Sequence, residues 1–356
     1  MSKILEIRLT PLEPYFFGSD RTFYYGEKDI KRVGQRSYYV RSEKIPMQTT
    51  LFGILRYLGI RDVKEDYDIR ESEKDIGSAS FRYGEPDQKF GRIQSVSPLY
   101  LVSRDGHRYM PVPMDHKKGE SRYTPFTKYR EVKTTVGRQL LPVDYIAKDG
   151  ISGGFIDTGT GEVISPDEVF GSVEKTGIDI NRQKNAYFKM EYCRLDPEFS
   201  FAFRAVVEDE FPQVEQRSVY MGGKKSAFLA SVTESCDNSP EEELKELLKE
   251  HPGKIIYVAS DAYLRDEGNV AGIEAAENSA LFSIVDFKTA REYVTNYGKK
   301  SQRDRFTKSE RLYRLVRAGS IFITESSQTE KIAALFTDPH FNTIGMNHYI
   351  IGGSEK

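Results

Sequence analysis

Cysteine is scarce in this sequence: Cys193 and Cys236 are its only two in 356 residues. Two cysteines cannot complete a zinc site by themselves, and so few of them suit a reducing compartment. The sequence also lacks a long apolar run, and its start lacks the pattern of a signal peptide. We therefore expect a cytoplasmic protein with no membrane span, no metal and no cofactor.

The sequence also lacks an excess of either charge. It has 52 Lys and Arg against 54 Asp and Glu, a formal net charge of -2. That balance excludes a uniformly basic nucleic-acid binder, but it leaves room for a local basic surface. With 38% hydrophobic and 30% charged residues, a chain of this length is expected to fold, as one large domain or two lobes.

Recognisable catalytic motifs are missing as well. The sequence has no phosphate-binding P-loop, no zinc-spaced Cys/His set and no nucleophile elbow. The S-x-x-K match at Ser172–Lys175 lacks its partner motifs, and Gly159–Gly161 is typical of a hairpin turn. His348, in the C-terminal loop, remains a candidate general base for RNA cleavage, with no second acid or base nearby in sequence.

Alternation of apolar and polar residues predicts several strands. Leu5, Ile7 and Leu9 alternate with charged residues, and residues 199–207 alternate for five positions. Leu51, Ile54, Leu55 and Leu58 instead have helical spacing, with Thr49 or Thr50 able to cap the helix start. Arg56 lies off this apolar stripe, so we expect its side chain to be solvated.

Residues 175–204 have a pattern that predicts a β-hairpin followed by a core strand. A polar segment at 181–185 separates a short β-branched stretch from an alternating one at 186–195, which predicts a β-hairpin. Lys175, Arg182, Lys184 and Lys189 make this hairpin basic. We expect it to lead directly into a core strand of a second lobe, beginning near Phe199.

Three other segments have compositions that suit RNA. Residues 299–317 hold eight Lys or Arg against two acids, and residues 117–138 mix seven Lys or Arg with aromatic residues. Gly222–Lys225 joins a glycine pair to a lysine pair, which fits either a phosphate-binding loop or a β-turn. The aromatic stretch 15–25 fits either a base-stacking surface or a loop folded onto the core, and the segment 117–138 fits either a single-stranded RNA surface or a solvated loop.

The second half repeats the strand–helix–strand order of the first. Ser239-Pro240 followed by Glu242 predicts a helix start, Pro252-Gly253 its stop, and residues 255–259 a buried strand. Two such units predict an α+β fold with two ferredoxin-like, RNA-recognition-motif-like lobes.

Five short motifs in this order resemble a known family. They are Leu12–Phe17, Pro46–Arg56, Gly177–Asp179, Gly222-Gly223 and Ala318–Ile321. Together they resemble the third subunit of the type III-B CRISPR (Cmr) effector complex, a group within the RAMP superfamily. No motif aligns within residues 61–175.

The resemblance implies a non-catalytic subunit with two ferredoxin-like lobes, at 1–197 and 198–356, and an inserted β-hairpin thumb. It implies that the chain holds the 5′ handle of a crRNA and joins the large polymerase-like subunit to the backbone RAMP subunits. The candidate RNA-binding residues are Gln48, Thr49, Thr50, Arg56, Lys175, Arg182, Lys184, Lys189, Gly222, Gly223, Lys224, Lys225, Arg303, Arg305, Lys308, Arg311, Asn347 and His348.

Three alternatives remain open at this point. The chain could be a RAMP-type endoribonuclease that processes precursor crRNA, with His348 or His340 as the base. It could be the equivalent subunit of a type III-A or III-D complex. It could also be a protein-interaction module whose basic runs are solvated faces.

Overall fold

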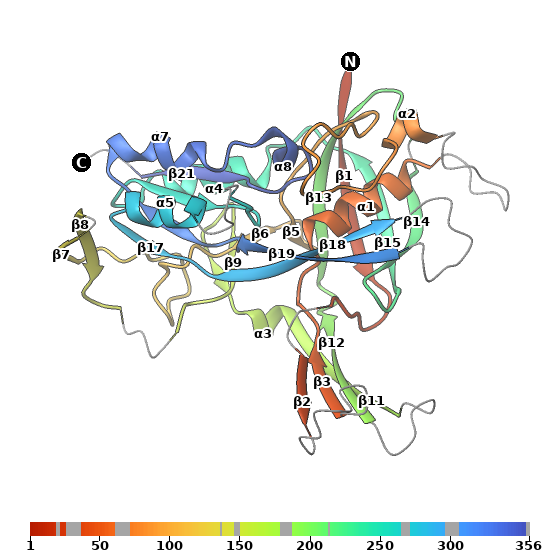
Figure 1. The fold of residues 1–356 in the computed structure, drawn as a ribbon, viewed down its shortest axis with the longest axis horizontal. Helices are drawn as coiled ribbons and strands as arrows, with labels where there is room; N and C mark the ends of the chain where they lie inside the picture. Colours follow the sequence, from red (N-terminus) through yellow and green to blue (C-terminus); the bar gives the residue numbers. More distant parts are fainter. Residues whose placement is uncertain are drawn as a thin grey trace.

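The computed structural model describes ten segments of the chain: 1–18, 22–25, 37–60, 72–135, 137–145, 150–178, 187–212, 214–264, 271–295 and 306–353. Over these residues the fold mixes α and β structure and is dominated by sheets (Figure 1). This agrees with the α+β class expected from the sequence.

A nine-stranded antiparallel sheet forms the largest element. Its path is β10-β9-β6-β5-β13-β1-β15-β14, with β4 also paired to β13. Along the chain these strands are β1 (Ser2–Pro11), β4 (Ile93–Val96), β5 (Tyr100–Ser103), β6 (Arg108–Pro111), β9 (Phe155–Asp157), β10 (Val163–Ile164), β13 (Phe199–Glu208), β14 (Gln216–Met221) and β15 (Ser226–Glu234).

The two central strands confirm the alternation in the sequence. Ile7 pairs with Phe203 and Leu9 with Phe201, and these side chains are buried on one face of the sheet. The expected lobe boundary after residue 197 falls inside this sheet, because β1 lies between β13 and β15. Sequence alternation identifies a strand but does not reveal its pairing partner.

Helix α1 (Gln48–Leu58) covers the apolar face of this sheet. Leu51, Phe52 and Leu55 are buried in the same core as β1 and β13, which confirms the predicted helix. The predicted cap is wrong: Met47 occupies the N-cap, and no side chain caps the helix. A short helix, α2 (Glu73–Ile76), follows.

A second, four-stranded antiparallel sheet is built from the C-terminal part of the chain. Its order is β17-β20-β16-β21, and its chain order is β16 (Ile255–Val258), α5 (Ala271–Ser279), β17 (Phe282–Ile284), β20 (Ile321–Ile323), α7 (Ser326–Ala334) and β21 (Tyr349–Gly352). Helix α4 (Pro240–Leu248) has the predicted Ser239 cap and capping box. Helix α8 (Pro339–Thr343) precedes the last strand.

A third sheet projects away from the other two (Figure 1). Its order is β11-β12-β3-β2, from β2 (Thr22–Tyr25), β3 (Ser37–Arg41), β11 (Phe170–Ile178) and β12 (Tyr187–Leu195), with α3 (Pro166–Val169) leading into it. We call it the projecting sheet. The antiparallel pairing of β11 with β12 confirms the predicted hairpin, whose tip lies outside the described residues.

Two antiparallel ribbons complete the fold. In the first, β18 (Phe287–Thr295) pairs with β19 (Phe306–Val316). This ribbon extends from the four-stranded sheet across the nine-stranded one, where Ala290, Tyr313 and Leu315 enter the core (Figure 1). The second ribbon is a hairpin of β7 (Tyr129–Thr134) and β8 (Gly137–Pro142).

Candidate nucleic-acid interface

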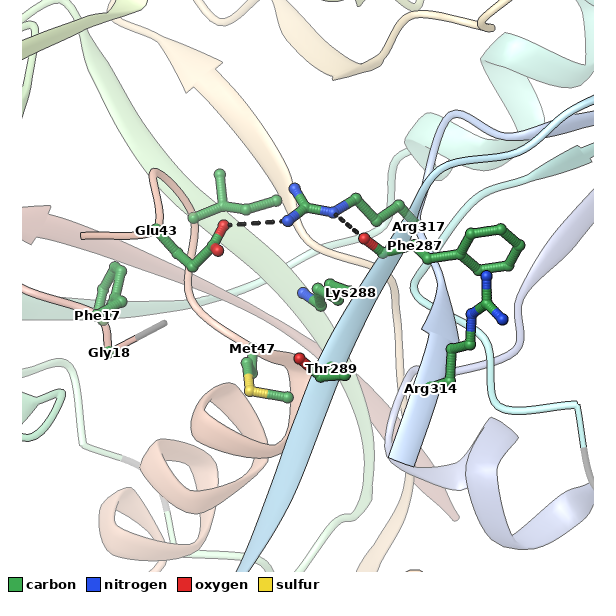
Figure 2. Close-up of a pocket in the computed structure, with 10 residues that line it drawn as sticks. Phe17, Gly18, Glu43, Met47, Phe287, Lys288, Thr289, Arg314 and Arg317 are labelled. Atoms are coloured by element: carbon green, nitrogen blue, oxygen red, sulfur yellow. Dashed lines mark hydrogen bonds and ion pairs between the residues drawn. The ribbon is translucent and has the colours of Figure 1, made fainter. Parts of the chain in front are cut away.

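A cleft lies where the projecting sheet, the β18–β19 ribbon and the start of α1 meet. It consists of two adjoining hollows of about 680 Å³ and 180 Å³. Glu43, Ile45, Lys288 and Arg317 line both hollows, so the two lie side by side. We call this feature the junction cleft, and Figure 2 shows its smaller part.

Among the described residues, five cations line the junction cleft, and they come from separate parts of the chain. Arg41 ends β3 and Lys44 follows it, at the base of the projecting sheet. Lys288 and Arg314 belong to the ribbon, and Arg317 follows it directly. The fold therefore brings residues about 270 positions apart into one basic surface, as Arg317 and Glu43 show by their ion pair.

Carboxylates pair with most of these cations. Arg317 lies 3.5 Å from Glu43 and 3.3 Å from Asp286, while Lys288 forms an ion pair with Asp261. Lys44 lies 3.8 Å from Asp167, and both side chains are substantially exposed. An exposed ion pair contributes only about 0–1 kcal/mol, so an incoming phosphate could replace the carboxylate of Asp167.

At the projecting-sheet side of the cleft, Arg41 and Tyr39 converge on one carboxylate. Arg41 Nε donates to Glu191 Oε2 at 2.8 Å, and the Tyr39 hydroxyl donates to the same oxygen. The hydrogen bond from Arg41 favours the ionised carboxylate and holds the pKa of Glu191 below its usual range. The same oxygen raises the pKa of Tyr39, so this tyrosine remains a neutral donor.

Apolar side chains line both sides of the smaller hollow. Phe17, Ile45, Met47 and Phe287 line it, and the Arg314 guanidinium lies 3.9 Å from the centroid of the Phe287 ring (Figure 2). Apolar and aromatic surface beside cations is the combination that single-stranded nucleic acid requires, for its bases and its phosphates respectively.

The predicted residues on α1 lie largely in the protein interior. Gln48 is buried, and its Nε2 donates to the Ser97 carbonyl at 2.6 Å. Arg56 is also buried, and its guanidinium donates to the carbonyls of Ile76 and Gly77. The expectation of a solvated Arg56 is therefore wrong, because the segment after α1 folds back over it. Thr49 and Thr50 are half-buried.

The predicted residues of the C-terminal loop also face inward. Asn347 is buried, has a φ of 61°, and makes two hydrogen bonds through its side chain to the backbone of Tyr263. His348 Nδ1 lies 3.1 Å from Glu241 Oε1, and Nε2 lies 3.2 Å from the Asn342 carbonyl. Burial lowers the pKa of His348, but the hydrogen bond to Glu241, the negative charge of Glu241 and the hydrogen bond to Asn342 together outweigh burial, so the net pKa is raised.

Gly222–Lys225 forms the turn between β14 and β15. Of the two alternatives from the sequence, a phosphate-binding loop or a β-turn, this confirms the β-turn. Lys225 N donates to Gly222 O at 3.0 Å. Gly222 has a φ of 73°, and a Cβ there would lie 2.3 Å from the Phe16 carbonyl oxygen. Glycine is therefore required by local packing. Gly223, Lys224 and Lys225 are exposed and remain candidate RNA contacts.

The basic residues of the projecting sheet have different neighbours, an aromatic ring in one case and a carboxylate in another. Lys175 is exposed, with Nζ 4.3 Å from the centroid of the Tyr192 ring, and Lys189 pairs with Glu174 at 2.8 Å. Arg311 is also exposed, on β19. Some of the predicted RNA-binding residues lie outside the part of the chain that the structure describes. They are Arg182, Lys184, Arg303, Arg305 and, for its side chain, Lys308.

Both aromatic stretches of the sequence turn inward where they are described. Tyr15, Phe16 and Phe17 are buried, which confirms that part of 15–25 is folded onto the core. In 117–138, Phe126 is buried and the Tyr123 hydroxyl donates to Asp115 at 2.9 Å. These rings are therefore not available to stack on bases.

The sequence analysis did not select the five cations of the junction cleft. Arg314 and Arg317 do lie within the basic run at 299–317, but that run was too long to single them out. Arg41, Lys44 and Lys288 lie in segments of ordinary composition. Within the described segments, no group of three or more His, Cys, Asp or Glu could hold a metal ion, and no helix is long and apolar enough to cross a membrane.

Comparison with protein families gives one match that covers nearly the whole chain. The family model described as "CRISPR-associated protein (Cas_Cmr3)" matches residues 7–353. Comparison with curated proteins finds no relative that matches.

Solved structures of low sequence identity have similar folds. A chain of the "Type III-B Cmr-beta bound to cognate target RNA" is 12% identical, with a TM-score of 0.50, 97% of this chain covered and 96% of that chain. A chain of the same assembly with AMPPnP is 11% identical, with a TM-score of 0.48 and 98% of each chain covered. A chain of a type III-A Csm3–Csm4 subcomplex is 12% identical, with a TM-score of 0.36 and coverage of 90% and 93%.

Proposed function

Because the chain belongs to the CRISPR-associated Cas_Cmr3 family, we propose that it holds the 5′ handle of a crRNA in a type III-B (Cmr) effector complex. The observation that carries this proposal is the family match over residues 7–353. The structure similar at a TM-score of 0.50 supports the fold, and it comes from a type III-B assembly bound to target RNA.

The junction cleft supports the RNA-binding part of the proposal. Lys44 and Arg314 are exposed cations at its rim, and the half-buried side chains of Ile45 and Met47 offer apolar surface beside them. A single-stranded handle could place its phosphates on the cations and a base against the apolar surface. The projecting sheet stands next to this cleft, where a thumb that shapes the bound handle would be needed.

The order of the strands supports two ferredoxin-like lobes. In the C-terminal sheet, the units β16-α5-β17 and β20-α7-β21 give the spatial order 2-3-1-4, which is the ferredoxin-like arrangement. In the nine-stranded sheet, β4-β13-β1-β15 has the same order, with α1 after the first strand and β14 in place of the second helix. We assign β13–β15 to the first lobe on this basis.

The proposed partners are the large polymerase-like subunit and the backbone RAMP subunits of the complex, which the chain would join. The two cysteines are unpaired, with Cys193 buried and Cys236 exposed. Free thiols suit a reducing compartment, so the proposal includes a cytoplasmic location.

The direct test is to purify the protein from its native host and sequence the RNA that co-purifies. We expect a uniform set of short RNAs that share one 5′ sequence and differ in the guide that follows. A matched purification of the same chain without residues 170–195, which form half of the projecting sheet, controls for RNA carried by other subunits. A random mixture of cellular RNA with the intact chain would contradict handle binding.

We further propose that the chain is not itself a nuclease. Both nitrogens of His348 have partners within the protein, and its raised pKa favours the protonated form, which cannot act as a base. His340 is buried, and its Nε2 lies 2.7 Å from the Arg82 carbonyl.

We therefore expect purified protein to leave repeat-containing RNA intact, with or without divalent metal ions. Gel analysis of the RNA would check this, with the His348→Ala and His340→Ala variants as matched samples. Cleavage at one site that disappears in either variant would favour the endoribonuclease alternative.

A further inference from the structure

Among the residues that the structure describes, the β7–β8 hairpin has an edge along which no further strand pairs. It stands at one end of the molecule, apart from the projecting sheet (Figure 1). β8 is tethered through Leu140 N, which donates to the Leu281 carbonyl at 2.7 Å. Within the part of the chain that the structure describes, β7 pairs with β8 and with no other strand. An edge strand presents backbone N–H and C=O groups that another strand can pair with.

One face of this hairpin is turned toward the protein. Tyr129 packs against Phe282 with 6.1 Å between ring centroids, and its hydroxyl donates to the Phe126 carbonyl. On the same face, Arg138 forms ion pairs with Glu131 at 3.0 Å and with Glu325 at 3.3 Å. These contacts fix the hairpin's orientation and leave no aromatic ring of the hairpin free to stack on a base.

The opposite face has exposed aliphatic side chains. Arg130 pairs in register with Leu141, and Val132 with Gln139. The side chains of Leu141 and Val143 are 43% and 65% exposed. Large aliphatic side chains exposed together on a strand pair are typical of protein contacts.

The same edge also carries positive charge. Lys128, Arg130 and Lys133 are exposed, and among the described residues Glu131, the acidic residue of β7, pairs with Arg138 rather than with any of them. The chain as a whole has a net charge of -2, so this is a local concentration of charge. A partner that covers it must be acidic.

We propose that β7 is a docking edge for an extended acidic segment of a protein partner, which adds to the hairpin as a third strand. Main-chain hydrogen bonds to β7 would supply affinity, and carboxylates beside Lys128 and Arg130 would supply specificity. RNA is the less suitable occupant, because the exposed apolar residues are aliphatic and the nearby rings face inward. The inference rests on the proposed function in one respect: the partner is another subunit of the same assembly.

The test compares hydrogen exchange in the free protein and in an effector complex reconstituted from purified subunits and crRNA. We expect those amides of β7 that point away from β8 to exchange about tenfold more slowly in the complex, because a strand added at this edge would accept hydrogen bonds from them. A photo-crosslinking residue placed at Val143 should capture a segment rich in Asp and Glu.

A charge-reversal variant and a matched control make the test specific. Lys128→Glu/Arg130→Glu should lower the crosslinking yield about tenfold through charge repulsion. Lys245→Glu/Lys331→Glu changes the net charge equally, on exposed residues of α4 and α7, and should leave the yield unchanged.

Three results would overturn the inference. If crRNA alone protects residues 129–134 in the isolated chain, the occupant is RNA. If the wild-type chain enters the complex with crRNA but β7 exchange does not change, the docking edge is wrong while the proposed function stands. If the wild-type chain does not enter the complex, both fail together.

Discussion

Replacing Lys44 and Arg314 together by glutamate is expected to lower the affinity for crRNA about a hundredfold, because a charged hydrogen bond contributes about 1.5 kcal/mol or more. Both side chains are exposed at the rim of the junction cleft. Lys44 forms an exposed ion pair with Asp167 and lies 5.7 Å from the centroid of the Phe170 ring, and Arg314 lies over the ring of Phe287. Their replacement should therefore disturb RNA contacts more than it disturbs folding.

The measurement is a filter-binding titration at several salt concentrations. Each lost phosphate contact should reduce the slope of log affinity against log salt by about 0.7, so the double variant should lose about twice that value. RNAs with a correct and with a scrambled 5′ handle should be compared, because loss of preference locates the handle in the cleft. The Lys245→Glu/Lys331→Glu variant is the control for net charge, and equal affinities of the two variants would mean that the cleft does not bind RNA.

Replacing Phe201 by alanine is expected to destabilise the protein by about 3–5 kcal/mol, the usual cost of removing a buried aromatic ring. Phe201 is fully buried on the central strand β13. Its ring centroid lies 5.7 Å from that of Tyr15, 6.5 Å from Phe17 and 6.4 Å from Phe170. These three residues lie where the chain enters the projecting sheet, so the loss should also loosen that sheet.

Urea denaturation followed by circular dichroism would measure the change as a lower midpoint. Tyr220→Ala is the matched control, because Tyr220 lies on β14 of the same nine-stranded sheet and is 67% exposed. An exposed substitution of this kind should change stability by about 0.5 kcal/mol or less. If both variants unfold at the same urea concentration as the wild type, Phe201 does not anchor the core in this way.

The order of residues along the chain was sufficient to predict the local elements. Alternation predicted β1, β13 and the β11–β12 hairpin, and the Ser239 cap predicted the start of α4. Each of these signals depends on neighbours within a few positions, where backbone geometry alone decides which side chains share a face. The ordered motifs were likewise sufficient for the family.

Solvent exposure of individual polar residues could not be predicted in the same way. Arg56 and Asn347 have polar side chains of the kind that bind RNA. In the structure both are buried and form hydrogen bonds with backbone groups. What covers them comes from other segments: residues 76–77 lie over Arg56, and Tyr263 lies over Asn347. A short sequence window contains no information about such a covering segment.

The sequence by itself determined β1, β13, the β11–β12 hairpin, the helices α1 and α4, and membership of the family, because these depend on local pattern. The tertiary structure alone decided which cations form the junction cleft. Arg41, Lys288 and Arg317 come together only because β3 joins the projecting sheet and the β18–β19 ribbon crosses to meet its base. The contacts that bring them together are long-range, and the pairing of distant strands is set by the packing of whole faces rather than by the residues that finally meet in the cleft.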